Sequence, residues 1–89
     1  MEPDDLNYHH LRLFRAVVRA GSVAAAAREL HLTPQTVSEQ VAALERTLGA
    51  VLLDRSGRAV APTETGRLVA TCADAIFERG RELVELVRQ

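Results

Sequence analysis

The sequence predicts a mainly helical chain with one small β-hairpin and a long C-terminal helix. Apolar residues recur three and four positions apart in several segments, as they do on the buried side of a helix. Gly, Ser, Thr and Pro stand between these segments, where helices end and begin. One Ser-Gly dipeptide separates two short runs with the composition of strands. With 89 residues and 47% apolar content, the chain has the size of one domain with a modest core.

Two helices are expected in the first third of the chain. The first runs from Tyr8 to about Ala20, and Gly21 follows it as a residue that tolerates the left-handed conformation of a helix end. Ser22 is expected to cap a second helix over residues 23–30, whose alanines favour helix and let a neighbour pack closely. The acidic leader, residues 2–5, is expected to be disordered.

A third helix is predicted after a short turn. Thr33 is a good N-cap, and Pro34 occupies the first helical position, where its missing N–H costs nothing. The helix continues to about Leu48 and ends at Gly49. Two helices joined in this way, the second of them polar on its outer side, form a candidate helix-turn-helix.

The outer side of this third helix has an unusual composition. Its apolar residues share one stripe: Val37, Val41, Leu44 and Leu48. The opposite stripe carries short amides, a hydroxyl and a methyl where a solvated helix more often has long Glu and Lys side chains: Gln35, Ser38, Glu39, Ala42 and Arg46. Such a stripe is either a solvated surface or a surface for a polar partner.

A small hairpin is predicted from two short runs, residues 52–55 and 59–61, that flank the Ser-Gly turn. Arg55 and Arg58 would lie at or near its tip. Pro62 is expected to end the second strand because proline cannot continue the hydrogen-bond ladder.

Thr63 is expected to cap a last helix that continues to Gln89, about 40 Å long at 1.5 Å per residue. This helix is too long to be covered by the rest of the chain. A seam with the 3.5-residue period of paired helices runs along it: Val69, Ala73, Ile76, Gly80, Leu83 and Val87. We therefore expect a homodimer in which this helix packs against its copy.

Charge and composition exclude several classes of protein. With 11 basic and 12 acidic residues the net charge is -1, so a nucleic-acid partner would have to be met by a local patch. The single cysteine cannot form an internal disulfide. No secretory signal and no membrane-spanning run is recognised, so a cytoplasmic location without a membrane partner is expected.

Three other groups of residues are given ordinary structural roles. His9, His10 and His31 lack the spacing of metal ligands, so we expect them at the surface or in packing, and no metal site is predicted. Cys72 is expected to be a small buried side chain of the last helix. Ser, His and Asp are present without a glycine-flanked nucleophile, so neither catalysis nor a cofactor is predicted.

The order of several motifs resembles the DNA-binding region of LysR-type transcriptional regulators. A helix is followed by Gly-Ser and an Ala-rich helix, then by "TPQTVS", "ALERTLG", "LLDRSGR" and "TETG" before a long helix, over residues 8–89. The segments "NYHHLRLF" and "GSVAAAARELHLTPQT" are similar to the branch that regulates a sodium-proton antiporter gene. Family members are normally longer, with an effector-binding domain after the linker helix. The resemblance thus implies that this chain is a fragment, and that oligomers above the dimer need that further domain.

The resemblance implies a winged helix-turn-helix that binds DNA over residues 1–62, and a linker and dimerisation helix over residues 63–89. The third helix would enter the major groove, and Arg58 of the wing would enter the minor groove. The residues expected to contact DNA are Ser22, Thr33, Pro34, Gln35, Thr36, Ser38, Glu39, Gln40, Arg55 and Arg58. Gln pairs with adenine, Ser with several base edges, and Glu accepts from cytosine, which accounts for the polar stripe.

Some of these assignments have alternatives. Ser22 and Thr33 either cap helices only or also hold phosphates. Arg55 either contacts DNA or forms an ion pair with Asp54 or a carboxylate of the third helix. Glu39 departs from the family, in which Arg is usual, and either repels the DNA backbone or reads a cytosine.

Two functions therefore follow from the sequence. The first is sequence-specific binding of double-stranded DNA by a homodimer that is not an enzyme. The alternative is a winged-helix module for protein interaction that binds no DNA, which the net charge of -1 permits. Salt distinguishes them, because arginine contacts to phosphate release counterions and weaken steeply as salt is added.

Overall fold

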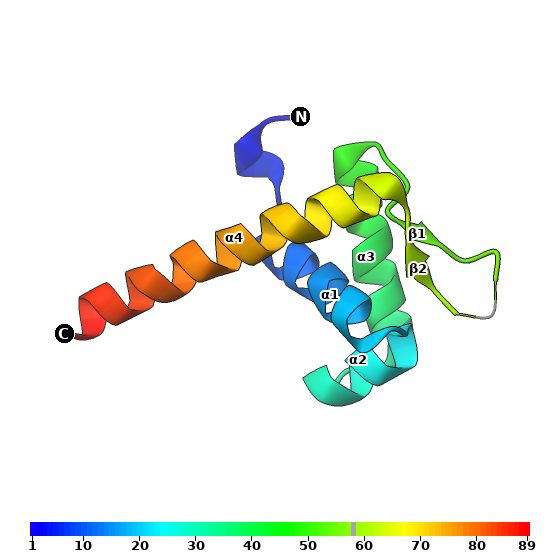
Figure 1. Cartoon of the computed structure of the whole chain (residues 1–89), viewed down its shortest axis with the longest axis horizontal. Helices are drawn as coiled ribbons and strands as arrows, with labels where there is room; N and C mark the ends of the chain where they lie inside the picture. Colours follow the sequence, from blue (N-terminus) through cyan, green and yellow to red (C-terminus); the bar gives the residue numbers. More distant parts are fainter. Residues whose placement is uncertain (58) are drawn as a thin grey trace.

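A computed structural model describes residues 1–57 and 59–89, so Arg58 lies outside the described residues. The elements follow in the order η1 (Pro3–Asp5), α1 (Tyr8–Ala20), α2 (Val23–Leu30), α3 (Pro34–Leu48), β1 (Leu53–Asp54), β2 (Ala61–Pro62) and α4 (Glu64–Arg88). Helices α1, α2 and α3 form a head, the β-hairpin projects from one end of it, and α4 crosses α1 and extends beyond (Figure 1). The predicted helical fold with one hairpin is confirmed.

The helix ends form where local chemistry predicts them. Three caps accept a hydrogen bond through the side-chain hydroxyl from the backbone N–H three residues on: Ser22, Thr33 and Thr63. Gly21 and Gly49 end α1 and α3 with φ of 83° and 67°, a left-handed conformation in which glycine has no Cβ penalty. Asn7, which the sequence did not single out, caps α1 by accepting from the N–H of His10 at 3.0 Å.

The core lies where the three helices of the head meet. Phe14 and Leu13 of α1 are fully buried, together with Val37 and Leu44 of α3. The same cluster includes Ala26 and Ala27 of α2, Ala73 of α4, and Leu52 and Leu53 at the base of the β1–β2 hairpin, which we call the wing. The first half of α4 therefore packs against the head.

The hairpin and the N-terminal leader differ from the prediction. The strands are only two residues long and pair antiparallel, with Leu53 opposite Pro62. Pro62 is the last residue of the second strand, as predicted, and the N–H that follows it, that of Thr63, bonds to the Leu52 carbonyl at 2.9 Å. The leader, predicted to be disordered, forms the short 3-10 helix η1, in which Glu2 N–H bonds to Asp5 at 3.0 Å.

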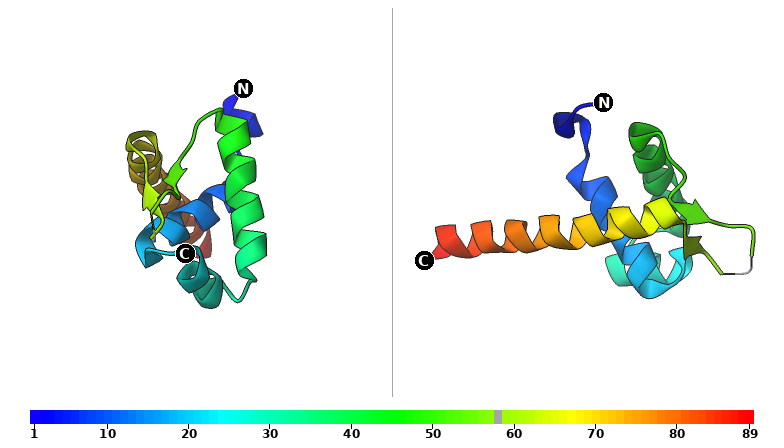
Figure 2. Two further views of the ribbon diagram at one scale, coloured as in Figure 1. Left: turned by 90° about the vertical axis from the view of Figure 1, so that its right-hand side faces the viewer. Right: turned by 45° about the horizontal axis from the view of Figure 1, so that its top comes forward.

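The C-terminal half of α4 extends away from the head as a straight helix (Figure 2). Near its start the helix packs closely, since a Cβ at Gly66 would overlap the Leu52 carbonyl oxygen. Further along, Leu83, Leu86 and Val87 have at least three fifths of their surface exposed. The longest dimension of the chain, 46 Å, reflects this projecting helix.

Candidate nucleic-acid interface

Helix α3 lies along one side of the head beside the wing (Figure 2). Val37, Val41 and Leu44 on the inner side are fully buried. On the outer side Gln35, Glu39 and Arg46 are exposed, whereas Ser38 and Ala42 are half-buried. The predicted division of this helix into an apolar and a polar side is confirmed.

At the start of α3 two hydroxyls and a backbone N–H are joined by hydrogen bonds. The Thr33 hydroxyl accepts from the Thr36 N–H at 3.1 Å and donates to the Thr36 hydroxyl oxygen at 2.9 Å. Because the Thr36 oxygen accepts this bond, its own proton is free for an acceptor outside the chain. Pro34 at the first helical position is exposed beside them. This end of the helix combines a donor with the positive end of the helix dipole, which suits a phosphate.

Gln35 and Glu39 are paired on the outer side of α3. The Gln35 amide donates to Glu39 Oε1 at 3.2 Å, across one turn of the helix. The bond leaves the second amide hydrogen and the amide oxygen of Gln35 available, which are the two groups that adenine requires. Glu39 therefore orients the Gln35 amide in addition to carrying its own charge.

Ser22 and Gln40 are less accessible than the stripe. Ser22 is half-buried, and its hydroxyl oxygen accepts from the Ala25 N–H at 3.0 Å, so its capping role is present. The amide oxygen of Gln40 is buried without a hydrogen-bond donor among the described residues. Part of the Gln40 side chain therefore faces the protein, which makes Gln40 the weakest of the predicted DNA contacts.

The wing is held to α3 by Glu45, a residue that the sequence did not single out. Its carboxylate accepts from the N–H of Leu52 at 2.8 Å and from that of Leu53 at 3.4 Å. The same carboxylate lies 3.7 Å from the Arg55 guanidinium. Arg55 is thus paired with a carboxylate of α3, one of the two alternatives that the sequence left open. Its side chain still has 44% of its surface exposed, so a phosphate could also reach it.

Asp54, the other possible partner of Arg55, is engaged in the turn instead. Its carboxylate accepts from the Ser56 hydroxyl at 2.7 Å and from the Ser56 N–H at 2.9 Å. These bonds, the hydroxyl first, hold the pKa of the Asp54 carboxyl below its ordinary value of 3.8. Arg58, predicted for the minor groove, lies outside the described residues and stays a prediction.

A groove separates the second half of α3 from the wing. It has a volume of about 430 Å³, and Ala42 and Arg46 of α3 line it together with Val51 and Arg55 from the wing side. Arg46 was on the polar stripe but not among the residues predicted to bind DNA. Arg46 and Arg55 both line this groove, together with the Glu45 carboxylate that pairs with Arg55.

The structure divides the seam that was predicted for dimerisation. Ala73 is fully buried against the chain's own core, so its side chain is inaccessible to a second chain, and Val69 and Gly80 are half-buried. Ile76, Leu83 and Val87 are exposed and can still meet a partner. Three further apolar residues of α4 are exposed without having been predicted: Leu68, Val84 and Leu86.

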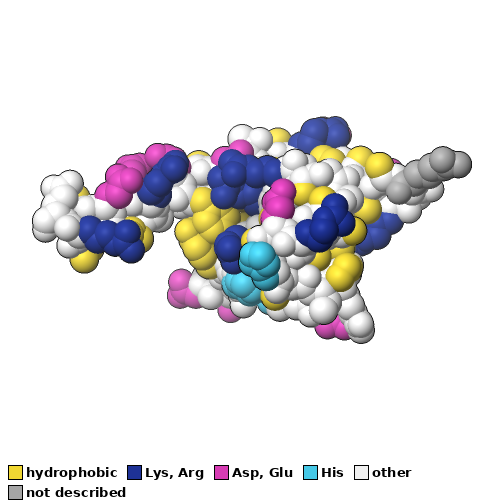
Figure 3. Space-filling view, turned by 90° about the horizontal axis from the view of Figure 1, so that it is seen from below, with side chains coloured by type: hydrophobic (Ala, Val, Ile, Leu, Met, Phe, Trp, Pro, Cys, Tyr) yellow, Lys and Arg dark blue, Asp and Glu magenta, His cyan; other side chains and the backbone are white. Residues whose placement is uncertain are grey.

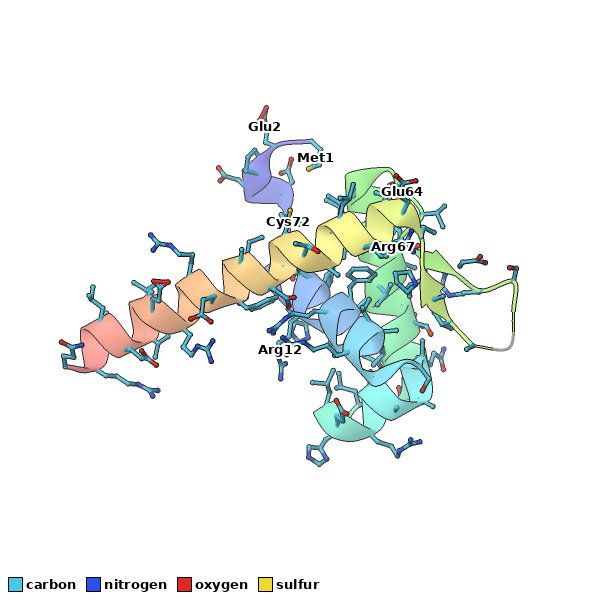
Figure 4. The ribbon with its side chains drawn as sticks, in the orientation of Figure 1. Met1, Glu2, Arg12, Glu64, Arg67 and Cys72 are labelled. Atoms are coloured by element: carbon cyan, nitrogen blue, oxygen red, sulfur yellow. The ribbon has the colours of Figure 1, made fainter. Side chains whose placement is uncertain are left out.

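Cys72 is exposed, contrary to the prediction that it is buried. It lies on the edge of α4 below the N-terminal segment (Figure 4). An apolar pocket of about 220 Å³ opens there, lined by Leu6, Leu11, Leu48, Leu68, Val69, Cys72 and Ile76. Burial in α4 falls one position later, at Ala73, about 100° further around the helix.

The histidines take surface and packing positions, as expected. His9 is exposed, His10 is half-buried, and His31 is exposed at the end of α2. Nowhere in residues 1–57 and 59–89 do three His, Cys, Asp or Glu side chains gather to hold a metal ion. No helix within these ranges is long and apolar enough to cross a membrane.

A helical head with an outward polar helix, a two-stranded wing beside it and a long projecting helix defines a winged helix-turn-helix protein. The family model described as "Bacterial regulatory helix-turn-helix protein, lysR family" matches residues 8–67. The chain belongs to this LysR family, as its motifs predicted.

Proteins with similar sequences are named as transcriptional regulators. The chain is 42% identical over 87 residues to "Transcriptional activator protein NhaR" of Escherichia coli (strain K12), a match that covers 98% of this chain and 29% of that protein. It is 45% identical over 91 residues to "HTH-type transcriptional regulator TrpI" of Pseudomonas aeruginosa, covering 100% of this chain and 30% of that protein. The chain thus spans less than a third of the length of these relatives.

Solved structures with the same fold include DNA complexes. The structure described as "Crystal Structure of BenM_DBD/catB site 1 DNA Complex" superposes with a TM-score of 0.89 at 32% identity, covering 92% of this chain and 91% of that one. "Crystal structure of CbnR_DBD-DNA complex" gives 0.86 at 36% identity, covering 92% and 94%. Both likenesses extend over nearly all of this chain.

Proposed function

We propose that this chain is the DNA-binding module of a bacterial LysR-type transcriptional regulator, and that it binds double-stranded DNA sequence-specifically as a homodimer in the cytoplasm. The observation that carries the proposal is the polar side of α3, which stands outward on a fold shared with the BenM and CbnR DNA complexes. In this proposal residues 1–62 contact DNA and residues 63–89 link and dimerise. The first turns of α4 also pack on the head.

The proposed reading groups are Gln35, Ser38 and Glu39, in the N-terminal half of the outer side of α3. The Gln35 amide suits adenine, the Ser38 hydroxyl suits several base edges, and the Glu39 carboxylate suits the amino group of cytosine. Ser22, Thr33, Pro34 and Thr36 lie near helix starts and would hold the sugar-phosphate backbone. Gln40 has the least support in this set because its amide oxygen is buried.

The groove between α3 and the wing is proposed to receive one sugar-phosphate strand. A helix in the major groove and a wing in the adjacent minor groove leave one strand between them, and the groove of about 430 Å³ lies in that position. Arg46 and Arg55, which both line the groove, would contact its phosphates. Arg58 is proposed to enter the minor groove.

The exposed apolar half of α4 supports a homodimer. Leu83, Leu86 and Val87 have between 62% and 74% of their surface exposed. Large apolar side chains that gather on a protein surface in this way mark a surface for a partner. Leu83→Glu is expected to convert the dimer to a monomer in sedimentation at micromolar concentration. Arg81→Glu, which adds negative charge on the opposite side of α4, is the matched control and should leave the dimer intact.

Salt dependence tests the DNA-binding function. After selection of bound sequences from random duplexes, the selected inverted repeat is titrated against a scrambled duplex of equal length. If Arg46 and Arg55 of both protomers each neutralise one phosphate, affinity should fall about 10²-fold between 50 and 200 mM salt. Binding that is equal for both duplexes would refute sequence-specific recognition. The absence of binding at low salt would favour a protein-interaction module.

Single substitutions separate reading from positioning. Gln35→Ala should cost about 1–3 kcal/mol of discrimination at one base position, with little change at others. Arg55→Ala should weaken binding to all sequences alike and reduce the salt slope by about 0.9 for each phosphate that Arg55 neutralises in the wild type. If Gln35→Ala lowers affinity uniformly, the proposed reading role is wrong.

A further inference from the structure

The junction between α1 and α4 contains an aromatic pair at the point where α4 leaves the head. Tyr8, the first residue of α1, packs on Phe77 of α4 with 4.4 Å between ring centroids and 57° between ring planes. Tyr8 keeps about half of its surface exposed. Figure 3 views this side of the molecule, where hydrophobic surface between the projecting helix and the head is bordered by Arg and His side chains.

Gly80 lies one turn beyond Phe77, against the hydroxyl end of the Tyr8 side chain. A Cβ at Gly80 would stand 2.5 Å from the Tyr8 hydroxyl oxygen and 3.7 Å from the ring carbon that carries it. Gly80 is in the interior of α4, and positive φ among the described glycines is confined to Gly21 and Gly49. Because glycine is a poor helix former, the backbone gives no reason for it at this position. Space for the Tyr8 hydroxyl is the reason that the geometry supplies.

Two charged contacts fix the same crossing one turn earlier. Arg15 of α1 donates through Nε to Asp74 of α4 at 2.7 Å, and its guanidinium lies 5.0 Å from the centre of the Phe77 ring. Together Tyr8, Arg15, Asp74, Phe77 and Gly80 form what we call the α1–α4 clamp. Beyond Gly80, the apolar residues of α4 are those exposed for a second chain. The clamp therefore lies where α4 leaves the head, immediately before these exposed residues.

We propose that Tyr8 and Gly80 are positioning residues that set the half-site spacing of the DNA this protein selects. This inference rests on the proposed function, in which the distal half of α4 joins two heads. From Gly66 to Gly80 the helix spans about 21 Å, so the clamp and the Gly66 contact fix its direction at two separated points. The direction of α4 relative to each head determines how far apart, and at what angle, the two α3 helices stand.

Spacing on DNA is sensitive to this angle. One inserted base pair moves a half-site by about 3.4 Å and rotates it by about 34°, since a turn takes 10–10.5 base pairs. A dimer with a rigid crossing cannot follow this rotation without deforming the DNA. We expect the wild-type protein to lose about tenfold or more in affinity for one inserted base pair.

The test uses the selected inverted repeat with the half-site separation changed by one base pair in either direction. Gly80→Ala places a methyl against the Tyr8 hydroxyl, displaces the ring and loosens the crossing, so the loss per inserted base pair should fall from about tenfold to about threefold or less. Tyr8→Phe removes the hydroxyl that the methyl meets and keeps the ring. The double variant Gly80→Ala with Tyr8→Phe should therefore recover the wild-type discrimination.

Ala75→Gly is the matched control. Ala75 is exposed on α4, so this change weakens the helix without touching the clamp. Ala75→Gly should leave the discrimination between half-site spacings unchanged. Circular dichroism verifies that each variant is folded. The inference is overturned if Gly80→Ala discriminates as the wild type does, if Tyr8→Phe fails to rescue it, or if Ala75→Gly has the same effect. A wild-type protein that binds every duplex equally would instead refute the proposed function.

Discussion

Replacing Glu45 with alanine should destabilise the head because this carboxylate joins α3 to the wing. It accepts from the N–H of Leu52 at 2.8 Å and from that of Leu53 at 3.4 Å, and its side chain is only 15% exposed. Without the Glu45 carboxylate, the partly buried N–H of Leu52 loses its hydrogen-bond acceptor. The Arg55 guanidinium is deprived of its partner at the same time.

The two effects differ in size. Leaving the backbone donor unpaired costs about 1–3 kcal/mol. The ion pair is long, at 3.7 Å, and the Arg55 side chain is 44% exposed, so after screening it is worth no more than about 0.5 kcal/mol. Glu45→Ala should therefore lower the free energy of unfolding by about 2–3 kcal/mol, nearly all of it through the backbone hydrogen bonds. For a domain of this size that corresponds to a fall in Tm of roughly 10–20 °C.

Thermal unfolding followed by circular dichroism at fixed protein concentration measures this effect, because dimerisation makes Tm depend on concentration. Glu45→Gln keeps an acceptor oxygen and should reduce the free energy of unfolding by only about a third as much as Glu45→Ala does. Arg55→Ala should change Tm by less than about 4 °C but weaken DNA binding. Equal destabilisation by Glu45→Ala and Arg55→Ala would refute the reasoning, since the ion pair would then be the main interaction.

Three further outcomes are expected. Glu39→Ala should relax base preference at one position of the selected site. If the affinity instead rises equally for all duplexes, Glu39 only repels the DNA backbone and reads no base. Gly66→Ala should lower the free energy of unfolding in a denaturant titration by about 1–3 kcal/mol, because the methyl meets the Leu52 backbone, and a neutral result would disprove that close approach. Arg15 holds the pKa of Asp74 below its ordinary value of 3.8, chiefly by its hydrogen bond. A carboxyl whose pKa is lowered by folding stabilises the protein above the unfolded pKa and stops doing so as the pH falls through the folded one. The stability difference between wild type and Asp74→Asn should thus be constant at neutral pH, begin to shrink near pH 3.8 and vanish once the pH is below the lowered pKa of Asp74; persistence in strong acid would contradict the role of the Arg15 bond.

The sequence alone determined the helices and the family. Helices begin at the N-caps Ser22, Thr33 and Thr63, and two of them end at Gly21 and Gly49. These residues act through contacts within a few residues of the same segment, so their effect can be predicted without the rest of the fold. The two sides of α3 follow in the same way from the helical period. Order and wording of the motifs then predicted the LysR family.

Only the tertiary structure decided which side of α4 faces the head and what holds the wing. The 3.5-residue seam drifts by about 20° per heptad on a straight helix, so spacing does not separate Ala73, buried in the head, from Leu83, exposed beyond it. The position of α1 beneath α4 makes that separation, and it sets Gly80 against Tyr8. Glu45 reaches backbone donors seven and eight residues away only because the chain folds back after Gly49. Such contacts depend on distances between elements, which no local pattern encodes.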